Sequence, residues 1–294
     1  MSEMNNRIAT IGFFDGVHLG HRFLFSHLQE EGKKRGLEPM IVTFQEHPRE
    51  VLRMGYRPQL LTSLQERVAL LEHYASVQLF RFDRIRYLTA AQFMRLLHEQ
   101  YHVQCLLIGY DHHFGSDRLS SPDEYRRIGE SVGVEVLLMD QYKLDNRHIS
   151  STEIRQSLLE GNIELANRLL GYDYSLSGKV VHGKGLGHQL GFPTANIALD
   201  EPRKLLPPQG VYVSEVSLPD GACYRAILNI GTNPTVNAHS AASPVSIELH
   251  IPDLERNLYD LHLSVQLIHF LRPERKFGSL EELRRQISKD LAML

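Results

Sequence analysis

The residues best suited to chemistry in the first half of the chain lie in one glycine-rich string. Gly12-Phe-Phe-Asp-Gly-Val-His-Leu-Gly-His21 directly follows an apolar run, and a helical pattern comes after it. Its glycines allow the backbone to approach a bulky ligand, and a helix N-terminus offers free N–H groups that suit phosphate. His18 and His21 are three residues apart, so a helix would turn both imidazoles toward one phosphate group. This arrangement favours nucleotidyl transfer, in which fixed donors stabilise the charge that gathers on the α-phosphate.

A glycine turn followed by a surface helix with two solvated histidines is the simpler interpretation of this string. The full run from Asp15 to His21 favours the functional one. Zinc binding is a further alternative, but no third ligand is placed with the two histidines.

Two more strings add to this first site. In Ser150-Ser-Thr-Glu-Ile-Arg155, Ser150 and Glu153 form a capping box that needs no function, while the hydroxyls of Ser151 and Thr152, with Arg155, would bind the departing pyrophosphate. Both interpretations can hold together. Gly109-Tyr-Asp-His-His-Phe-Gly115 follows another strand-like run, and Asp111 could hold a ribose or a flavin edge there.

A second glycine-rich string lies in the other half of the chain. Gly183, Gly185, Gly187 and Gly191, with Lys184 among them, form a loop whose amides could wrap phosphate. The loop joins strands, so it is neither a Walker loop nor a dinucleotide fingerprint, and a merely mobile loop is the plain alternative. Pro193-Thr-Ala-Asn196 follows directly and adds the hard oxygen ligands that Mg²⁺ takes.

A candidate base lies further on, in Val245-Ser-Ile-Glu-Leu-His-Ile251. Period-two alternation puts the apolar residues on one strand face and Ser246, Glu248 and His250 on the other. The polar face could simply be solvated. The functional interpretation has Glu248 accept the proton of a substrate hydroxyl, a contribution of about 10²–10⁴-fold to the rate.

The elements that must position these residues differ between the two halves. In the first half, strand-like runs alternate with helices that open on capping boxes, which predicts a doubly wound parallel sheet with ligands at the carboxyl ends of its strands. The predicted strands are Arg7–Phe14, Glu38–Phe44, Val77–Phe82, Val103–Tyr110 and Val134–Asp140, and the capping boxes open at Ser63, Thr89 and Ser121.

The second half changes to strand, turn and strand, which predicts a small antiparallel β-barrel closed by a C-terminal helix capped at Ser279. Its predicted strands are Ser175–His182, Val211–Leu218, Tyr224–Ile230, Val245–Ile251 and Leu261–Phe270, with a hairpin turn at Pro219-Asp-Gly221. A single helix is predicted over Ser150–Leu170, ending at Gly171. The domains would be 1–172, including a helical linker from about residue 158, and 173–294.

Length, charge and cysteine content limit the number of domains and the kinds of partner that the chain can have. A chain of 294 residues suits two domains, and a formal charge of −3 gives no general attraction to nucleic acid or anionic lipid. Cys105 and Cys223 both fall in apolar stretches, so we expect two reduced core residues of a cytosolic protein. The polar N-terminus predicts neither a signal peptide nor a membrane span.

The three strings of the first half together resemble the FMN adenylyltransferase module of the bacterial bifunctional riboflavin kinase/FAD synthetases, which are HxGH nucleotidyltransferases with a Rossmann-like fold. Phe13 and the Ser-Asp-Arg-Leu-Ser run after Gly115 depart from that pattern, in which Asn and a glycine-containing loop are usual. The resemblance implies that ATP is bound by Gly12, Phe13, Asp15, Gly16, His18, His21, Ser151, Thr152 and Arg155. It also implies that flavin is bound by Asp111, Phe44, His47 and Pro48.

The second half resembles the riboflavin kinase module, including Asn229-Ile-Gly-Thr-Asn-Pro-Thr235 and Arg272-Pro-Glu-Arg-Lys-Phe277. Asp260 and Asp173 stand where the family commonly has Gly and Pro. The resemblance implies that Glu248 is the base for the riboflavin hydroxyl, that Thr194 and Asn196 hold Mg²⁺, and that Arg272 and Phe277 contact the flavin. ATP would be bound in this half by Gly183, Lys184, Gly185, Gly187, Gly191, Pro193, Thr194 and Asn196.

The implied function is phosphorylation of riboflavin to FMN and adenylylation of FMN to FAD, with Mg²⁺ and ATP in two separate sites and ADP and pyrophosphate as by-products. No nucleic acid, membrane or protein partner is implied, and the implied location is the cytoplasm. A kinase-only enzyme with a degenerate adenylyltransferase domain is the alternative, and a flavin- or nucleotide-binding regulator without turnover is another.

Overall fold

The chain divides into two compact units, Met1–Ser151 and Thr152–Leu294. The structure, a computed structural model, describes residues 5–53, 55–109, 113–119, 121–140, 142–144, 147–183, 187, 191–232 and 245–294. The division falls earlier in the chain than the boundary near Tyr172 that the sequence suggests, and it groups the helices between the two positions with the barrel. The domain boundary therefore stays a prediction.

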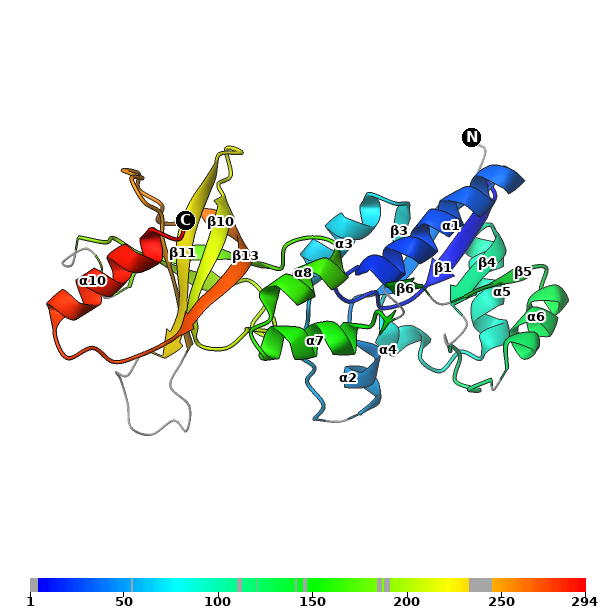
Figure 1. Ribbon diagram of the computed structural model, residues 1–294. Coiled ribbons are helices and arrows are strands. Elements are labelled where there is room, and N and C mark those ends of the chain that lie inside the picture. Colours follow the sequence, from blue (N-terminus) through cyan, green and yellow to red (C-terminus); the bar gives the residue numbers. More distant parts are fainter. Residues whose placement is uncertain are drawn as a thin grey trace. The chain divides into compact units, whose positions relative to one another are not determined.

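The first unit contains a five-stranded parallel sheet in the order β3-β2-β1-β4-β5 (Figure 1). The strands are β1 (Arg7–Ile11), β2 (Glu38–Phe44), β3 (Ser76–Phe80), β4 (Val103–Gly109) and β5 (Glu135–Met139). The strand order reverses between β1 and β4, and such a switch point opens a ligand crevice at the carboxyl ends of the strands. The predicted doubly wound sheet is confirmed: β2 has the predicted bounds, β3 lies one to two residues earlier, and β1, β4 and β5 are shorter than predicted.

Helices cover both faces of this sheet. They are α1 (Leu19–Arg35), α2 (Pro48–Leu52), α3 (Leu64–Glu72), α4 (Phe82–Ile85), α5 (Ala90–Tyr101) and α6 (Pro122–Ser131), and a short pair, β6 (Lys143–Leu144) and β7 (Arg147–His148), follows β5. Successive strand residues face opposite sides: Ile8 packs with α1 and α3, whereas Ala9 packs with α5 and α6. Burial on both faces explains why these strands are nearly continuous apolar runs.

The predicted capping boxes are present at the starts of α3, α5 and α6. Ser63, Thr89 and Ser121 each accept from the backbone N–H three residues on, and the Glu or Gln there returns a hydrogen bond. The start of each helix is therefore determined by residues within one turn of it.

The second unit is a closed antiparallel barrel in the order β10-β11-β12-β9-β8-β13. The elements are β8 (Ser175–Val181), β9 (Ala195–Leu199), β10 (Gly210–Ser217), β11 (Cys223–Thr232), β12 (Val245–His250), β13 (His262–Pro273) and the helix α10 (Leu280–Leu291), which Ser279 caps (Figure 1). The predicted barrel is confirmed, together with the turn at Gly221. The strand β9 was not predicted, because Pro193-Thr-Ala-Asn196 gives its start a polar, loop-like pattern.

The predicted single helix over residues 150–170 is wrong. Two helices occupy this stretch, α7 (Ser151–Leu159) and α8 (Ile163–Leu170). Gly161 has φ of 76°, and Asn162 caps α8 by accepting a hydrogen bond from the Leu165 N–H at 3.2 Å. A left-handed glycine followed by a cap ends one helix and starts another, and the left-handed Gly171 ends α8 as predicted.

The prediction of two core cysteines is half wrong. Cys105 is buried in β4, but Cys223 is exposed. The barrel register pairs Cys223 with Ser217 at the first rung after the hairpin turn, so its side chain lies at the end of the strand pair. Among the described residues, no helix is long and apolar enough to cross a membrane.

The different burial of the two thiols makes them differ in reactivity. Burial raises the pKa of Cys105 from 9.0 to about 12, so this thiol stays protonated at pH 8. Alkylating reagents are attacked by the thiolate and not by the thiol. We expect iodoacetamide to modify Cys223 alone in the folded protein and both cysteines in denaturant. Intact mass with peptide mapping measures this. Modification of Cys105 at the same rate in the folded protein would contradict its burial.

The break between α7 and α8 needs a residue that tolerates a left-handed backbone. A Cβ at Gly161 would meet only ordinary contacts, 3.7 Å from Phe270 at the nearest, so strain comes from φ alone. We expect Gly161→Ala to lower the free energy of unfolding by about 1–2 kcal/mol, and Gly161→Asn by less, because Asn adopts this conformation more readily. Urea titration of both variants checks this, and equal losses would contradict the conformational explanation.

Candidate active sites

The loop after β1 has an unusual backbone that brings it close to the N-terminus of α1. Gly16 has φ of 79°, and two non-glycine residues, Phe14 and Val17, also have positive φ, of 53° and 37°. A Cβ at Gly12 would lie 2.6 Å from the Phe14 ring. Strained residues of this kind persist where the surrounding structure holds them and gather at functional sites.

The predicted histidine pair is brought together at the start of α1. His18 is the N-cap residue, is 4% exposed, and accepts from the His21 N–H through Nδ1 at 3.4 Å. The neutral His18 ring therefore carries its proton on Nε2. The two rings stack with centroids 3.6 Å apart, and the first turn of α1 holds no acidic residue. Two imidazoles and a positive helix end thus lie at one point of the sheet's carboxyl edge.

Asp15, predicted to contact ATP, uses its carboxylate to fasten this loop. The buried carboxylate accepts from the N–H of Leu61 at 3.0 and 3.1 Å and from the N–H and hydroxyl of Thr62 at 3.0 Å each. The Gly16 N–H donates to the same Thr62 hydroxyl at 3.1 Å, and the Ser151 hydroxyl donates to the Asp15 carbonyl at 3.0 Å. Asp15 therefore ties three segments together.

Only some of the residues expected to bind flavin in this unit lie close to one another. The Phe13 and His47 rings lie 4.6 Å apart, and His47 caps α2, whose first residue is Pro48. Phe44 is buried in the core against Phe82. Asp111 lies outside the described residues, and Thr152 and Arg155 belong to the second unit, so their roles stay predictions.

The sequence analysis did not identify Arg67. It is 1% exposed, its guanidinium lies 3.9 Å above the centre of the Phe13 ring, and it donates to the Phe44 carbonyl at 2.6 Å. Position 67 follows the capping box of α3, and nothing in the local pattern distinguishes it from a solvated arginine.

In the barrel, the strand register sets the predicted base beside the predicted metal ligand. Glu248 of β12 pairs with Asn196 of β9 on one side and with Asn229 of β11 on the other. Asn229 pairs in turn with Val211, and Val211 with Arg272. Residues opposite one another in antiparallel strands project to the same face. One row of side chains therefore crosses five strands.

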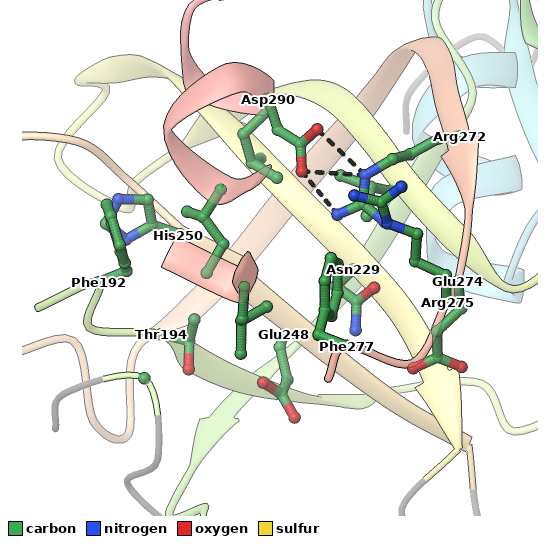
Figure 2. Close-up of a pocket in the computed structure, with 15 residues that line it drawn as sticks. Phe192, Thr194, Asn229, Glu248, His250, Arg272, Glu274, Arg275, Phe277 and Asp290 are labelled. Carbon is green, nitrogen blue, oxygen red and sulfur yellow. Dashed lines mark hydrogen bonds and ion pairs between the residues drawn. The ribbon is translucent and has the colours of Figure 1, made fainter. Parts of the chain in front are cut away.

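Most of this row faces a pocket of about 350 Å³ (Figure 2). Figure 2 shows Thr194 and Glu248 on one side of the pocket and the Arg272–Asp290 pair on the other. Phe192, Thr194, Asn229, Glu248, His250, Arg272 and Phe277 line it together with Leu283, Ile287 and Asp290 of α10. The predicted alternation of β12 is confirmed, because Ile247 and Leu249 are buried while Glu248 and His250 line the pocket.

An ion pair joins α10 to the barrel at this pocket. Arg272 donates to the buried Asp290 carboxylate from Nε, at 3.1 Å to each oxygen, and from Nη2 at 2.6 Å. Gln286 also donates to Asp290, at 2.8 Å, and accepts from Arg275 at 2.6 Å. Arg272 and Phe277, which were predicted to contact the flavin, both line the pocket, but the Arg272 guanidinium is engaged by α10. Asp290 is 18 residues away in sequence, so no local pattern identified it.

A second pocket, of about 240 Å³, is also lined by Thr194. It is lined by Val180, Pro193, Thr194, Leu249, Leu258 and Tyr259, among others, so Thr194 lines both pockets. A Cβ at Gly187 would lie 2.9 Å from the Thr194 hydroxyl, and one at Gly183 would lie 2.0 Å from the Asn196 amide nitrogen. A side chain at either glycine would therefore press on the side chain of a predicted metal ligand.

The hydroxyl oxygen of Thr194 and the side-chain oxygen of Asn196 suit Mg²⁺, because this ion takes few protein ligands and completes its shell with phosphates and water. No group of three or more His, Cys, Asp or Glu side chains within the described part of the chain could hold a metal. Lys184 and Gly185 lie outside the described residues, and Gly191 has φ of 83°.

Comparison with known proteins identifies both units. Residues 1–153 match the FAD synthetase family and residues 170–294 match the riboflavin kinase family. Bifunctional riboflavin kinase/FMN adenylyltransferase of Escherichia coli K12 is 39% identical over 96% of this chain and 90% of its own length. The Pseudomonas fluorescens protein of the same name is 38% identical over 99% and 92%. The chain belongs to the bifunctional riboflavin kinase/FMN adenylyltransferase family.

The whole-chain fold recurs in a solved structure. A crystal structure of a Streptococcus pneumoniae protein described as a macrolide-efflux protein matches 98% of this chain and 93% of its own, with a TM-score of 0.87 and 29% identity. The family resemblance of both halves is confirmed by these comparisons.

The departures from the family pattern are accommodated locally in this chain. Asp260, where glycine is usual, has φ of 65° and pairs with Lys179 at 2.8 Å, which lowers the pKa of Asp260. Asp173 accepts from Asn167 at 2.9 Å. In the loop after Gly115, Asp117 accepts from the Ala90 N–H at 3.0 Å.

We expect the Arg272–Asp290 ion pair to contribute much of the free energy that holds α10 on the barrel. Removing one partner of a largely buried ion pair leaves the other charge uncompensated, so we expect Asp290→Asn to lower the free energy of unfolding by about 2–4 kcal/mol. The control on the same helix is Glu281→Gln, because that carboxylate is 84% exposed and 3.9 Å from Arg285, and we expect a change within about 0.5 kcal/mol. Urea titration of both variants measures this, and equal effects would contradict the assignment.

Proposed function

We propose that this chain phosphorylates riboflavin to FMN in its barrel and adenylylates FMN to FAD in its parallel-sheet unit, with ATP as the donor in both steps. The observation that carries the kinase assignment is that Thr194 lines two neighbouring pockets, one of which also contains Glu248. Two substrates held in pockets that share one residue can be brought together there for transfer.

In the barrel, the larger pocket would hold riboflavin and the smaller one the nucleoside end of ATP. The riboflavin 5′-hydroxyl oxygen attacks the γ-phosphorus, the bond to the β-phosphate oxygen breaks, and ADP leaves. Glu248 accepts the hydroxyl proton. Phe277, with Phe192 and the apolar side of α10, would contact the flavin ring, and Arg272 would shape that wall through Asp290.

Thr194 and Asn196 would hold Mg²⁺, which neutralises charge on the phosphates when it is bound. The backbone amides from Gly183 to Gly191, with Lys184, would contact the phosphates. The close approach of Gly183 to Asn196 and of Gly187 to Thr194 supports this assignment.

In the parallel-sheet unit, an FMN phosphate oxygen would attack the α-phosphorus of ATP, and pyrophosphate would leave. His18 and His21 would stabilise the charge on the α-phosphate, together with the N-terminus of α1, while Gly12, Phe13 and Gly16 would line the ATP site. Ser151, Thr152 and Arg155 would contact the departing pyrophosphate. Phe44, His47, Pro48 and Asp111 remain the proposed flavin side, with Phe44 acting through the core beneath it.

The FAD synthetase match over residues 1–153 and the intact histidine pair support both activities over a kinase-only enzyme. Riboflavin, FMN and ATP are the substrates of this scheme, and FAD, ADP and pyrophosphate are its products. Because both steps consume ATP, we assign the enzyme to the cytoplasm.

The two sites should be separable by single substitutions. We expect Glu248→Gln to reduce riboflavin phosphorylation by about 10²–10⁴-fold, because the amide cannot accept the hydroxyl proton. Conversion of FMN to FAD should be unchanged. Chromatography of flavins over time, starting from riboflavin and separately from FMN, measures both steps.

The matched control is His21→Ala, which should impair FAD formation from FMN and leave riboflavin phosphorylation intact. Loss of both activities in either variant, with unchanged thermal unfolding, would contradict two independent sites.

A further inference from the structure

We propose that His250 is a positioning residue for phosphoryl transfer, which holds the segment carrying Thr194 by donating a hydrogen bond from its ring to the Pro193 carbonyl. The inference rests on the kinase activity proposed for the barrel. It assigns His250 no contact with the reacting atoms.

The backbone ladder ends just before the segment that His250 contacts. The strands β9 and β12 pair only at Asn196↔Glu248 and Ala195↔Leu249. Continuing this register would set Thr194 opposite His250, but β9 begins at Ala195. Pro193 has no N–H to donate to a neighbouring strand. Thr194 therefore lies at the first position outside the β9–β12 ladder, where other contacts hold it.

The His250 ring supplies such a contact. Its Nδ1 lies 2.7 Å from the Pro193 carbonyl oxygen. A carbonyl oxygen only accepts, so Nδ1 carries the proton, and this donor is present in both the Nδ1–H neutral ring and the protonated ring. The same ring meets Phe192 edge to face, with centroids 5.7 Å apart. His250 therefore contacts both residues that precede Thr194.

This contact links Thr194 to the base through one strand. His250 and Glu248 are two residues apart on β12 and line the same pocket. On the other side, the Phe192 N–H donates to the Gly187 carbonyl at 2.9 Å, and Gly187 packs closely on the Thr194 hydroxyl. The segment is thus fastened to β12 by His250 and to the glycine-rich loop by Phe192. Because in-line transfer is sensitive to displacements of about 1 Å, loosening this segment should slow the chemical step.

Amide substitutions can separate the donor from the rest of the ring. In His250→Asn, the side-chain amide nitrogen can take the place of Nδ1 and keep the donor. In His250→Gln, the amide lies one carbon further out, nearer the place of Nε2, and His250→Ala has no donor. All three variants are made in the full-length protein and assayed with riboflavin, Mg²⁺ and ATP.

We expect kcat for riboflavin phosphorylation to fall about 10–100-fold in His250→Ala and His250→Gln, with KM for riboflavin changed less than about threefold. His250→Asn should retain activity within about fivefold of the unsubstituted protein. Conversion of FMN to FAD should be unchanged in all three. Equal losses in the Asn and Gln variants, or full activity in His250→Ala, would overturn the proposal.

A measurement on the unsubstituted protein tests the geometry without relying on the variants. Two-bond ¹H–¹⁵N correlation spectra of the histidine rings, assigned by the peak lost in His250→Asn, should place the proton of His250 on Nδ1. The Nε2–H tautomer would overturn the proposal even if the Ala and Gln variants failed to fold. A protein that binds riboflavin and ATP but makes no FMN would instead contradict the kinase assignment.

Discussion

The strand register of the closed barrel is the constraint on which the kinase site depends. Antiparallel pairing sets Asn196, Glu248 and Asn229 in one row across three strands, and a shift of one residue in any of them would turn its side chain into the core. The apolar residues between them, such as Ile247, Leu249 and Leu228, fill the interior and hold that register. The barrel core and the row of proposed site residues are therefore two faces of the same strands.

The parallel-sheet unit depends on a different device, a buried carboxylate. A buried carboxylate is stable only when its oxygens are hydrogen-bonded, and Asp15 meets this requirement through Leu61 and Thr62, residues far from it in sequence. Those bonds hold the positive-φ backbone of the loop after β1, including Phe14 and Val17. The Asp15 carboxylate, which the sequence suggested as a contact to ATP, thus holds the backbone of this loop in place.

The helix α10 gives the barrel a wall that its strands alone do not supply. Leu283 and Ile287 provide the apolar lining, while the Arg272–Asp290 pair and Gln286 fix the end of the helix. A buried ion pair often adds little net stability but has strict geometry. In this enzyme it specifies where α10 lies on the barrel, and so the shape of the larger pocket.

The sequence alone determined the features that depend on a few neighbouring residues: the capping boxes at Ser63, Thr89 and Ser121, the left-handed end at Gly171 and the alternation around Glu248. It also identified the histidine pair, because its members are three residues apart at the start of a helix. Tertiary structure decided the contacts between distant residues: Arg272 with Asp290, His250 with Pro193, Asp15 with Thr62, and Arg67 with Phe13. It also decided the exposure of Cys223 and the sharing of Thr194 by two pockets. Local patterns follow from backbone geometry over one or two turns, whereas these contacts arise only when packing and register bring separate elements together.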